Sequence, residues 1–300
     1  MESSFKGRVA IVTGAGNGLG RAHALALAAR GAQVVVNDIG TSADGIGKTH
    51  EAADTVVSRI RDAGGNAMAS YDSVAEEDGA QRIIDLAVRE FGRLDILVNN
   101  AGIIRMGAVY EAKTADWDAV VKTHLYGTYY CTRAACGIMK KQGYGRIINT
   151  SSATGFGLIN SAAYSAAKEG ITGFSRTVAR DMAKHGVTCN VIRPIAAWRG
   201  RMDRPLSSVD VNQPEDIAPL VVYLASEQAG NVNGCIFEVW RGHVGIFVDP
   251  PPVEQVVWKD GRWTAEELMK VLPETLTRGR SAQKLPHTMP YFMTEIEEST

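Results

Sequence analysis

Two side chains with acid–base chemistry lie four residues apart in the stretch YSAAK, where Tyr164 is followed by Lys168. Residues four apart on a helix share one face, so the phenol and the ammonium would be neighbours. A free tyrosine has a pKa of about 10, and a nearby positive charge favours its phenolate form. A tyrosine shifted toward neutral pH can take a proton from an alcohol or give one to a carbonyl. Taken alone, such a pair is also typical of an ordinary helix surface.

A second group of residues resembles a nucleotide-binding turn. The stretch VTGAGNGLG, with Gly14, Gly18 and Gly20, follows the first predicted strand and opens the first predicted helix. Glycines permit a tight turn and let backbone N–H groups approach a pyrophosphate at a helix N-terminus. Asp38 ends the second predicted strand, where its carboxylate can bind the adenosine ribose and would repel a 2′-phosphate. The pattern predicts NAD rather than NADP, although a turn or a helix cap would also use these residues.

A scaffold must bring these groups together at one edge. Short β-branched runs alternate with helical patterns for about 240 residues, which predicts a doubly wound α/β fold with a parallel, Rossmann-type sheet. Ligands of such sheets bind beyond the carboxyl ends of the strands. Seven strands are expected, at Arg8–Val12, Gln33–Asn37, Asn66–Ser70, Asp95–Val98, Arg146–Thr150, Val187–Ile192 and Cys235–Val239.

One domain is expected over residues 1–248, and residues 249–300 form an extension. The DPPP run that begins at Asp249 cannot continue a strand or a helix. A capping box of Thr264 and Glu267 then predicts a short helix. We expect the extension to pack on the core or on a neighbouring subunit.

The composition is typical of a cytoplasmic enzyme. Of the 300 residues, 45% are apolar and 22% are charged, and the net charge of −1 offers no field for nucleic acid or an anionic membrane. The apolar runs are too short to span a membrane, and the first residues, MESSFKGR, predict no secretory signal. The four cysteines lack metal-site spacing, so we expect free thiols and no metal.

In this order along the chain, TGxxxGxG, Asp38, the NNAG turn, the serine pair and YxxxK resemble the short-chain dehydrogenase/reductase family. The resemblance covers residues 5–242. It implies hydride transfer between a nicotinamide and a carbinol or carbonyl carbon. It also implies that Tyr164 is the acid/base, that Lys168 lowers the tyrosine's pKa and holds the nicotinamide ribose, and that a serine orients the substrate oxygen.

The resemblance also implies which residues contact NAD. They are Gly14, Asn17, Gly18, Leu19, Gly20, Asp38, Asp72, Ser73, Asn100, Ala101, Gly102, Tyr164, Lys168, Pro194 and Ile195. Asp72 follows the third strand, where it meets the adenine amino group or merely caps a helix. The NNAG stretch, which holds Asn100, is by itself typical of a turn.

Two serines compete for the catalytic role. The family's SxxG pattern ends here at Gly155 and selects Ser152, whereas the family's more usual spacing of thirteen residues before Tyr164 selects Ser151. We predict Ser152, because the SxxG turn directly follows the strand and fixes the direction of the hydroxyl. The segment 156–163 is then one residue short, which a surface loop absorbs more easily than a strand end.

Three positions depart from the family pattern. His124 stands in the long central helix where an asparagine usually helps a water relay to the lysine, and a histidine can bind a water or simply pack. Ile195 replaces the glycine that usually follows Pro194. Arg241 replaces the first of two glycines after the last strand.

His124, VVVND, YDSV and the extension are similar to the (3R)-hydroxyacyl-CoA dehydrogenase unit of peroxisomal multifunctional enzyme and its bacterial single-domain relatives, some of which act on hydroxysteroids. This implies a 3-hydroxyacyl-CoA or a hydroxysteroid-type alcohol as substrate. The alternatives are a ketoreductase acting on a small or polycyclic ketone, and a non-catalytic NAD sensor. Four arginines in or beside the loop 195–210 meet CoA phosphates or remain solvated: Arg193, Arg199, Arg201 and Arg204. A homodimer or homotetramer is implied, paired through the two long helices.

Overall fold

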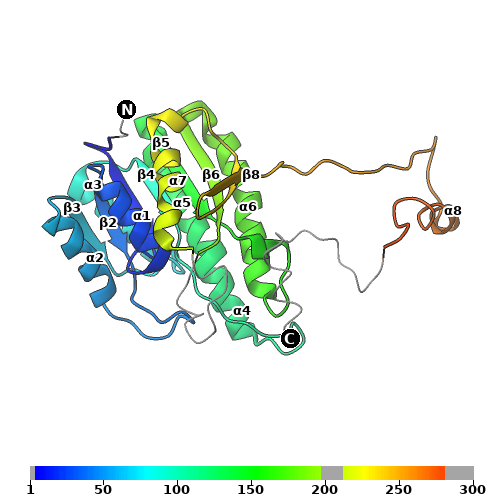
Figure 1. The fold of residues 1–300 in the computed structure, drawn as a ribbon, viewed down its shortest axis with the longest axis horizontal. Coiled ribbons are helices and arrows are strands. Elements are labelled where there is room, and N and C mark those ends of the chain that lie inside the picture. Colours follow the sequence, from blue (N-terminus) through cyan, green and yellow to red (C-terminus); the bar gives the residue numbers. More distant parts are fainter. Residues whose placement is uncertain (1–3, 197–211, 281–300) are drawn as a thin grey trace.

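The computed structural model describes residues 4–196 and 212–280. Its sheet has eight strands in the order β3-β2-β1-β4-β5-β6-β7-β8 (Figure 1). The strands are β1 (Val9–Thr13), β2 (Gln33–Asn37), β3 (Asn66–Ser70), β4 (Ile96–Asn99), β5 (Gly145–Thr150), β6 (Val187–Pro194), β7 (Ile236–Trp240) and β8 (His243–Ile246). The first seven pair in parallel. The strand order reverses between β1 and β4, where such sheets bind ligands.

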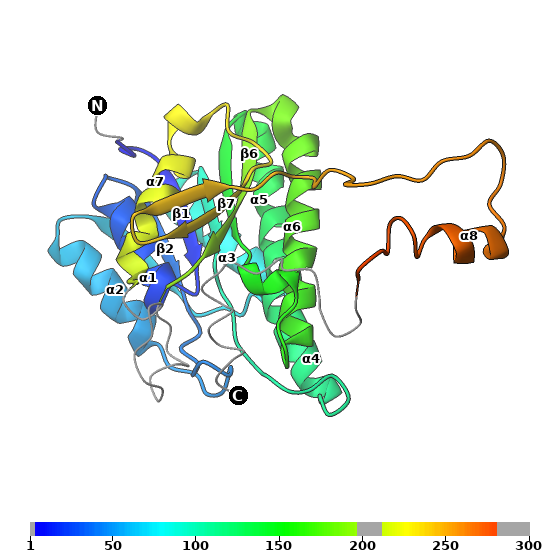
Figure 2. The same cartoon turned by 45° about the vertical axis from the view of Figure 1, so that its right-hand side comes forward.

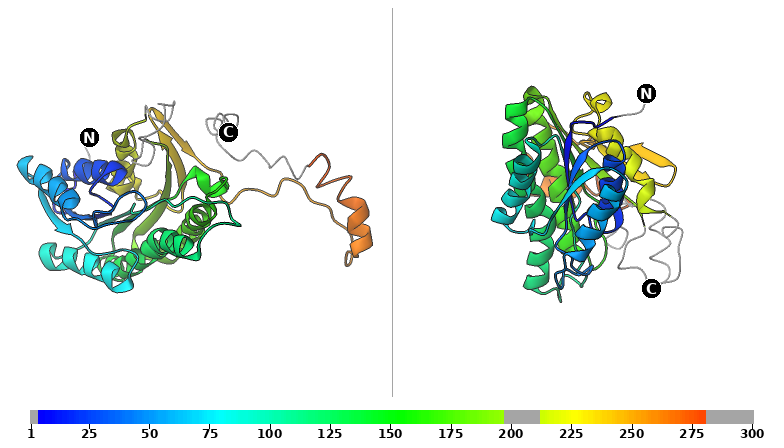
Figure 3. Two further views of the ribbon diagram at one scale, coloured as in Figure 1. Left: turned by 90° about the horizontal axis from the view of Figure 1, so that it is seen from below. Right: turned by 90° about the vertical axis from the view of Figure 1, so that its left-hand side faces the viewer.

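Helices cover both faces of the sheet. The helices of the described residues are α1 (Gly18–Ala28), α2 (Glu51–Asp62), α3 (Glu77–Phe91), α4 (Thr114–Val121), α5 (Gly127–Gln142), α6 (Ala162–Met182), α7 (Ala218–Ala225) and α8 (Ala265–Val271), of which α8 lies away from the sheet (Figure 1). The view from below shows α1, α2 and α7 on one face and α3, α5 and α6 on the other (Figure 3). Alternate residues of a strand point to opposite faces, so Ala10 and Val12 join one core cluster and Ile11 joins the other.

The fold class predicted from the sequence is confirmed, with one strand more than the seven expected. The additional strand, β8, pairs antiparallel with β7 and places Trp240 opposite His243. The chain reverses at Arg241 and Gly242, and Gly242 has a φ of 68°, in the left-handed region that favours glycine. The Trp240 and His243 rings stack with centroids 3.5 Å apart. Arg241 and Gly242, which stand where the family pattern has two glycines, therefore form the turn of a β-hairpin.

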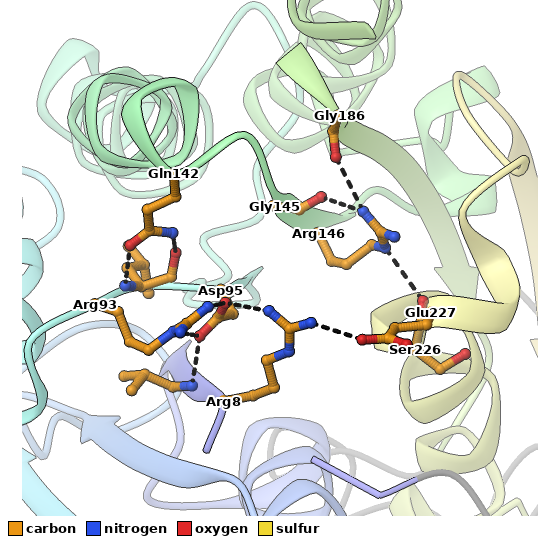
Figure 4. A network of polar contacts seen from close by, with 11 residues as sticks. Arg8, Arg93, Asp95, Gln142, Gly145, Arg146, Gly186, Ser226 and Glu227 are labelled. Atoms are coloured by element: carbon orange, nitrogen blue, oxygen red, sulfur yellow. Dashed lines mark hydrogen bonds and ion pairs between the residues drawn. The ribbon is translucent and has the colours of Figure 1, made fainter. Parts of the chain in front are cut away.

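A polar network ties the amino ends of the strands together, on the side away from the glycine turn (Figure 4). The buried Asp95 carboxylate accepts hydrogen bonds from the Val9 N–H at 2.9 Å, from Arg8 at 3.0 Å and from Arg93 at 2.6 Å. The guanidinium of Arg146 donates to three carbonyl groups, those of Gly145, Gly186 and Ser226. This end of the sheet is thus closed by structural contacts, which leaves the opposite end for chemistry.

The segment after β8 leaves the body of the molecule and carries α8 (Figures 1 and 2). The predicted capping box is present, because Thr264 accepts from the Glu267 N–H at 3.2 Å and Glu267 accepts from the Thr264 N–H at 2.7 Å. No residue of α8 is buried. In the part of the chain that the structure describes, no helix combines the length and the apolar character needed to cross a membrane.

Candidate active site

The glycine turn joins β1 to α1 and packs against the NNAG turn, Asn99–Gly102, which follows β4. Gly14 has a φ of 63°, and a Cβ there would lie 2.8 Å from the Cα of Ala101. The Asn100 side-chain amide donates to the carbonyls of Thr13 at 3.0 Å and Gly14 at 3.2 Å. The Thr13 hydroxyl in turn accepts from the N–H groups of Asn100 and Ala101. Asn100 and Ala101, predicted as cofactor contacts, therefore also shape the turn.

The N-terminus of α1 has the properties of a pyrophosphate site. Asn17 precedes the helix without a side-chain cap bond, and the first turn, which holds Leu19 and Gly20, carries no acidic residue. Gly18 has a φ of 50° and a Cβ there would meet no neighbour among the described residues. Unsatisfied N–H groups and the helix dipole both favour an anion at this place. The residues present therefore fit the phosphates of a dinucleotide.

Asp38 is held at the edge of the same turn. Its Oδ2 accepts from the Gly16 N–H at 2.8 Å, and its Oδ1 accepts from the Gly40 N–H at 2.7 Å. A Cβ at Gly16 would lie 2.8 Å from that carboxylate, so the backbone approaches Asp38 closely. The carboxylate is partly exposed beside the position where a ribose would bind.

Asp72 and Ser73 have local partners after β3. Asp72 forms an ion pair with Arg82, with 2.6 Å between the carboxylate and the guanidinium Nε. The Ser73 hydroxyl accepts from the Ala75 N–H at 3.2 Å, a turn that leads into α3. Neither contact is a helix cap, because the N-cap of α3 is Glu76, which has no side-chain cap bond, and an adenine contact by Asp72 stays a prediction.

Tyr164 and Ser152 are brought together at the carboxyl end of β5. The Ser152 hydroxyl accepts from the Thr154 N–H at 3.2 Å and from the Thr154 hydroxyl at 2.8 Å. Burial raises the pKa of Tyr164 above its ordinary value, and hydrogen bonds with the Ser152 and Thr154 side chains oppose this shift. Ser152 therefore faces the phenol and is placed to share one substrate oxygen with it.

Ser151 is directed to the other side of the strand. Its buried hydroxyl donates to the backbone carbonyl of Lys168 at 2.8 Å and lies 3.1 Å from the Thr172 hydroxyl. Both partners belong to α6. Between the two serines, the geometry thus favours Ser152 for a role beside the phenol.

Lys168 is buried beneath Tyr164. Its ammonium donates to the Thr150 carbonyl at 2.7 Å and lies 5.4 Å from the centroid of the tyrosine ring. Burial lowers the pKa of Lys168 to about 7. The pKa of Tyr164 is raised, and Lys168 is not among the groups that shift it. This differs from the expected lowering of the tyrosine's pKa by the ammonium, because burial of the phenol raises it.

His124 lies in a π-helical turn, Lys122–Tyr126, between α4 and α5. Such turns insert an extra residue into a helix and often occur at functional sites. The imidazole Nε2 lies 2.7 Å from the Ile103 carbonyl, and the ring meets Tyr164 edge-on with centroids 5.0 Å apart. A Cβ on Gly102 would collide with this ring, which gives that glycine a packing role. His124 Nδ1 is buried without a hydrogen-bond partner among the described residues.

The cause of the neutral state of His124 is also clear. Burial, together with the charge of Lys168, lowers the pKa of His124 to about 3. The neutral ring carries one N–H, and Nε2 faces both the Ile103 carbonyl at 2.7 Å and the Ile103 N–H at 3.1 Å, so it donates to the first or accepts from the second according to the tautomer. In either tautomer Nδ1 is left to form a hydrogen bond with water, as acceptor or as donor.

The end of β6 differs in part from expectation. The Ile195 N–H already donates to the Val239 carbonyl at 2.9 Å, so only the carbonyl of Ile195 is left for a nicotinamide amide. Arg193, expected at the mouth of the pocket, is 2% exposed and pairs with Glu169 at 2.6 Å. It faces α6 because strand residues alternate, and it is therefore not available to a CoA phosphate. The other three arginines predicted to meet CoA phosphates, Arg199, Arg201 and Arg204, lie outside the described residues.

A small pocket adjoins the N-terminus of α6. It lies between the loop after β4 and the start of α4, and its lining includes Met106, Trp117, Asn160 and Ala163. Arg105 borders it and is paired with Asp116 at 2.8 Å.

Several contacts at the site escaped the sequence analysis. Thr154 adds a hydroxyl beside the phenol. Its position two residues after Ser152 is typical of a serine turn, and this spacing could have indicated the contact from the sequence. The π-helical turn around His124 could not be predicted from the spacing of apolar residues. The Arg193–Glu169 pair joins residues 24 positions apart and has no local signal.

Known proteins resemble this chain along most of its length. A family model described as short chain dehydrogenase matches residues 8–207. Over 243 residues the chain is 48% identical to peroxisomal multifunctional enzyme type 2 of Mus musculus, which covers 80% of the chain and 32% of that protein. The chain thus spans about a third of the length of this relative.

Two further relatives align over nearly their whole length. A hydroxyacyl-CoA dehydrogenase of Mycobacterium tuberculosis is 36% identical over 287 residues, which cover 90% of the chain and 89% of that protein. The crystal structure of a short chain dehydrogenase from Mycobacterium avium is 42% identical, with a TM-score of 0.80. That match covers 92% of this chain and 96% of the solved chain.

Proposed function

The chain belongs to the short-chain dehydrogenase family, and from this premise we propose that it oxidises a secondary alcohol with NAD and uses Tyr164 as general acid/base. The family makes it an oxidoreductase acting on CH–OH groups, and its fold implies a nicotinamide cofactor. One observation carries the mechanism: the Tyr164 phenol meets Ser152 and Thr154 directly above the buried Lys168. The presence of this group argues against a non-catalytic NAD sensor.

The chemistry of the proposed reaction divides between cofactor and protein. The bound nicotinamide supplies the acceptor or donor of a hydride. Ser152 hydrogen-bonds the substrate oxygen and holds it against the phenol. During oxidation the Tyr164 phenol passes its own proton toward Lys168 and takes the hydroxyl proton in its place, and reduction reverses both transfers, a role that contributes about 10²–10⁴-fold in rate.

A proton taken by Tyr164 needs a way onward. Lys168 has a pKa of about 7 and therefore gains or loses a proton near neutral pH. His124 has an Nδ1 atom without a hydrogen-bond partner among the described residues and lies against Tyr164. We propose that a water bound by His124 connects this cluster to solvent, as the asparagine does in the family pattern.

NAD is proposed rather than NADP because of Asp38. Its carboxylate is anchored by two backbone N–H groups and cannot turn away from a 2′-phosphate without losing them. Placing a phosphate dianion beside a carboxylate is unfavourable. Gly14, Gly18 and the N-terminus of α1 would hold the pyrophosphate.

A 3-hydroxyacyl-CoA is the substrate class that the observations support best. The mycobacterial relative named as a hydroxyacyl-CoA dehydrogenase aligns along 90% of the chain. Two loops beside Tyr164 are joined by a hydrogen bond from Gly107 to Asn160. They expose four apolar side chains, Met106, Val109, Tyr110 and Ile159. An apolar rim suits an acyl chain or a steroid better than a small polar ketone.

The assembly is proposed to be a homodimer or homotetramer. Trp117, Tyr126 and Tyr129 expose 41%, 46% and 37% of their surface on α4, the π-helical turn and α5, which supports pairing through the long helices. The segment after Asp249 leaves the body, which supports a contact with a neighbouring subunit (Figure 2). A cytoplasmic location stays a prediction, because the mouse relative is named as peroxisomal.

The proposal is tested by an NAD-reduction screen over (3R)- and (3S)-hydroxyacyl-CoAs, hydroxysteroids and small alcohols, run in parallel with NADP. We expect NAD to be preferred and a hydroxyacyl-CoA to give the highest kcat/KM. A preference for NADP would refute the role of Asp38. Activity confined to reduction of small or polycyclic ketones would favour the ketoreductase instead.

A further inference from the structure

We propose that Phe247–Asp249, here called the C-terminal strap, positions the serine loop, Ser152–Gly157, through a stack of Phe247, Phe156 and Arg193. The strap follows β8 directly, and the extension leaves the body after it (Figure 1). The inference rests on the proposed function only where it concerns catalysis by Ser152; the contact itself is independent of it.

The contact between strap and loop is made by three side chains. The guanidinium carbon of Arg193 lies 4.1 Å from the Phe156 ring centroid and 5.1 Å from that of Phe247. The two rings lie 5.7 Å apart at an angle of 61°. Both distances from the guanidinium are within the range of cation–π attraction, which is stronger when the charge is withdrawn from water. Arg193 is 2% exposed, so its charge is withdrawn from water, whereas the Phe156 ring, 36% exposed, reaches the surface.

The same arginine is fixed from the side of α6. Its Nη2 lies 2.6 Å from a carboxylate oxygen of Glu169, the residue after Lys168. A Cβ on Gly155 would lie 2.6 Å from that carboxylate, so the serine loop lies directly on Glu169. The loop is therefore supported at Gly155 by the ion pair and at Phe156 by the aromatic stack.

The far end of the strap is anchored on α6 as well. The Asp249 carboxylate forms a two-pronged ion pair with Arg176, with 2.6 Å to Nε. Arg176 lies seven residues after Glu169, two turns along the same face of the helix. Between the two anchors, Val248 is 77% exposed. The strap thus crosses α6 between Arg193 and Arg176 and holds the Phe247 ring against Phe156.

This support bears on Ser152 because, in the described part of the chain, its hydroxyl contacts only its own loop apart from the Tyr164 phenol. Its partners are Thr154, within the same loop, and the phenol of Tyr164. The direction of the hydroxyl therefore depends on where the loop as a whole is held. A shift of a few tenths of an ångström at a catalytic group is costly, since about 1 Å can cost 10²-fold in rate.

The first test measures the contact without reference to any reaction. Hydrogen exchange by mass spectrometry is compared in the full chain, in Phe247→Ala and in Val248→Ala, which removes the neighbouring exposed side chain. We expect faster exchange in peptides that cover the serine loop only in Phe247→Ala. Phe247→Tyr, which keeps the ring, restores protection. Unchanged exchange in Phe247→Ala, or an equal increase in Val248→Ala, overturns the proposal.

The second test connects the strap to Ser152 by a double-mutant cycle on kcat. Phe247→Ala is expected to lower kcat about tenfold, within the range for a misplaced catalytic group, and to leave KM within about twofold. In the Ser152→Ala background the same change is expected to have no further effect. Equal losses in both backgrounds overturn a positioning role. If Ser152→Ala retains full kcat, the role of the serine fails, while the exchange experiment still decides the contact.

Discussion

The hydroxyl of Ser151 donates to the backbone carbonyl of Lys168 at 2.8 Å, and so fastens the end of β5 to α6. This single contact separates the two serines of the pair. The first holds the lysine's helix in place, and the second, Ser152, faces the Tyr164 phenol. Adjacent residues at a strand end point in opposite directions, so the two hydroxyls cannot exchange roles.

The two serines should therefore respond differently to replacement by alanine. Ser152→Ala is expected to lower kcat about a hundredfold, the usual effect of removing one hydrogen-bond donor to a reacting oxygen. Ser151→Ala should cost about 1 kcal/mol of unfolding free energy and little activity, because it loses a buried hydrogen bond. Initial rates and urea unfolding of both variants check this, and the reverse pattern would assign catalysis to Ser151.

Lys168 should make stability depend on pH. Burial lowers its pKa to about 7, below the 10.5 of an exposed lysine. Between these two values the unfolded chain binds more protons at this site than the folded chain, so the free energy of unfolding rises with pH. Lys168→Met removes this contribution. Urea unfolding from pH 6.5 to 10 should show the wild type gaining stability over the variant, whereas parallel curves would place the ammonium in a solvated site.

His124 should act through hydrogen bonding and not through its charge. Its pKa of about 3 keeps the ring neutral at ordinary working pH. His124→Asn keeps a group that can bind water, and should retain kcat within about threefold, whereas His124→Leu should lower it about tenfold or more. The pH–rate profiles of the wild type and His124→Asn should have the same acidic limb. Full activity of His124→Leu would contradict this role and would show that the histidine only packs against its neighbours.

Asp95 should stabilise the fold without taking part in catalysis. Its carboxylate is fully buried and holds Arg8 and Arg93, both of which reach solvent. Asp95→Ala should lower the free energy of unfolding by about 3 kcal/mol, the lower end for a broken buried ion pair, because the freed arginines can be hydrated. Glu227→Ala is a matched control, since Glu227 is 76% exposed and its pair with Arg8 is worth about 0.5 kcal/mol at most. Urea unfolding distinguishes the two, and an equal cost would contradict the buried network.

Much of the fold follows from local patterns. Apolar runs of strand length, glycine turns and helix caps are properties of neighbouring residues, so β2 and β3 occur at their predicted bounds and the capping box of Thr264 and Glu267 is confirmed. The family indicated by the motifs is confirmed by the matches to known proteins. The hairpin of β7 and β8 was not expected, because the familiar pattern ends the sheet one strand earlier.

The candidate site was predictable only in part. The order of motifs along the chain placed Tyr164, Lys168 and Asp38 at one edge, because parallel strands end together. The electrostatics were not predictable, since the direction of a pKa shift depends on burial by residues far along the chain. Tyr164 and Lys168 illustrate this: spacing suggested that the ammonium lowers the tyrosine's pKa, whereas burial lowers the lysine's own pKa. The long-range pair of Arg193 and Glu169 shows the same limit.

The most direct measurement of the central claim compares Tyr164→Phe with the wild type in NAD reduction and in NAD binding by calorimetry. Phenylalanine keeps the ring against His124 and removes only the proton-carrying oxygen. We predict that kcat falls about 10²–10⁴-fold, the contribution of a general acid/base, while the Kd for NAD changes less than about threefold. A variant that binds NAD normally and still turns over at the wild-type rate would contradict the assignment of Tyr164 as the acid/base.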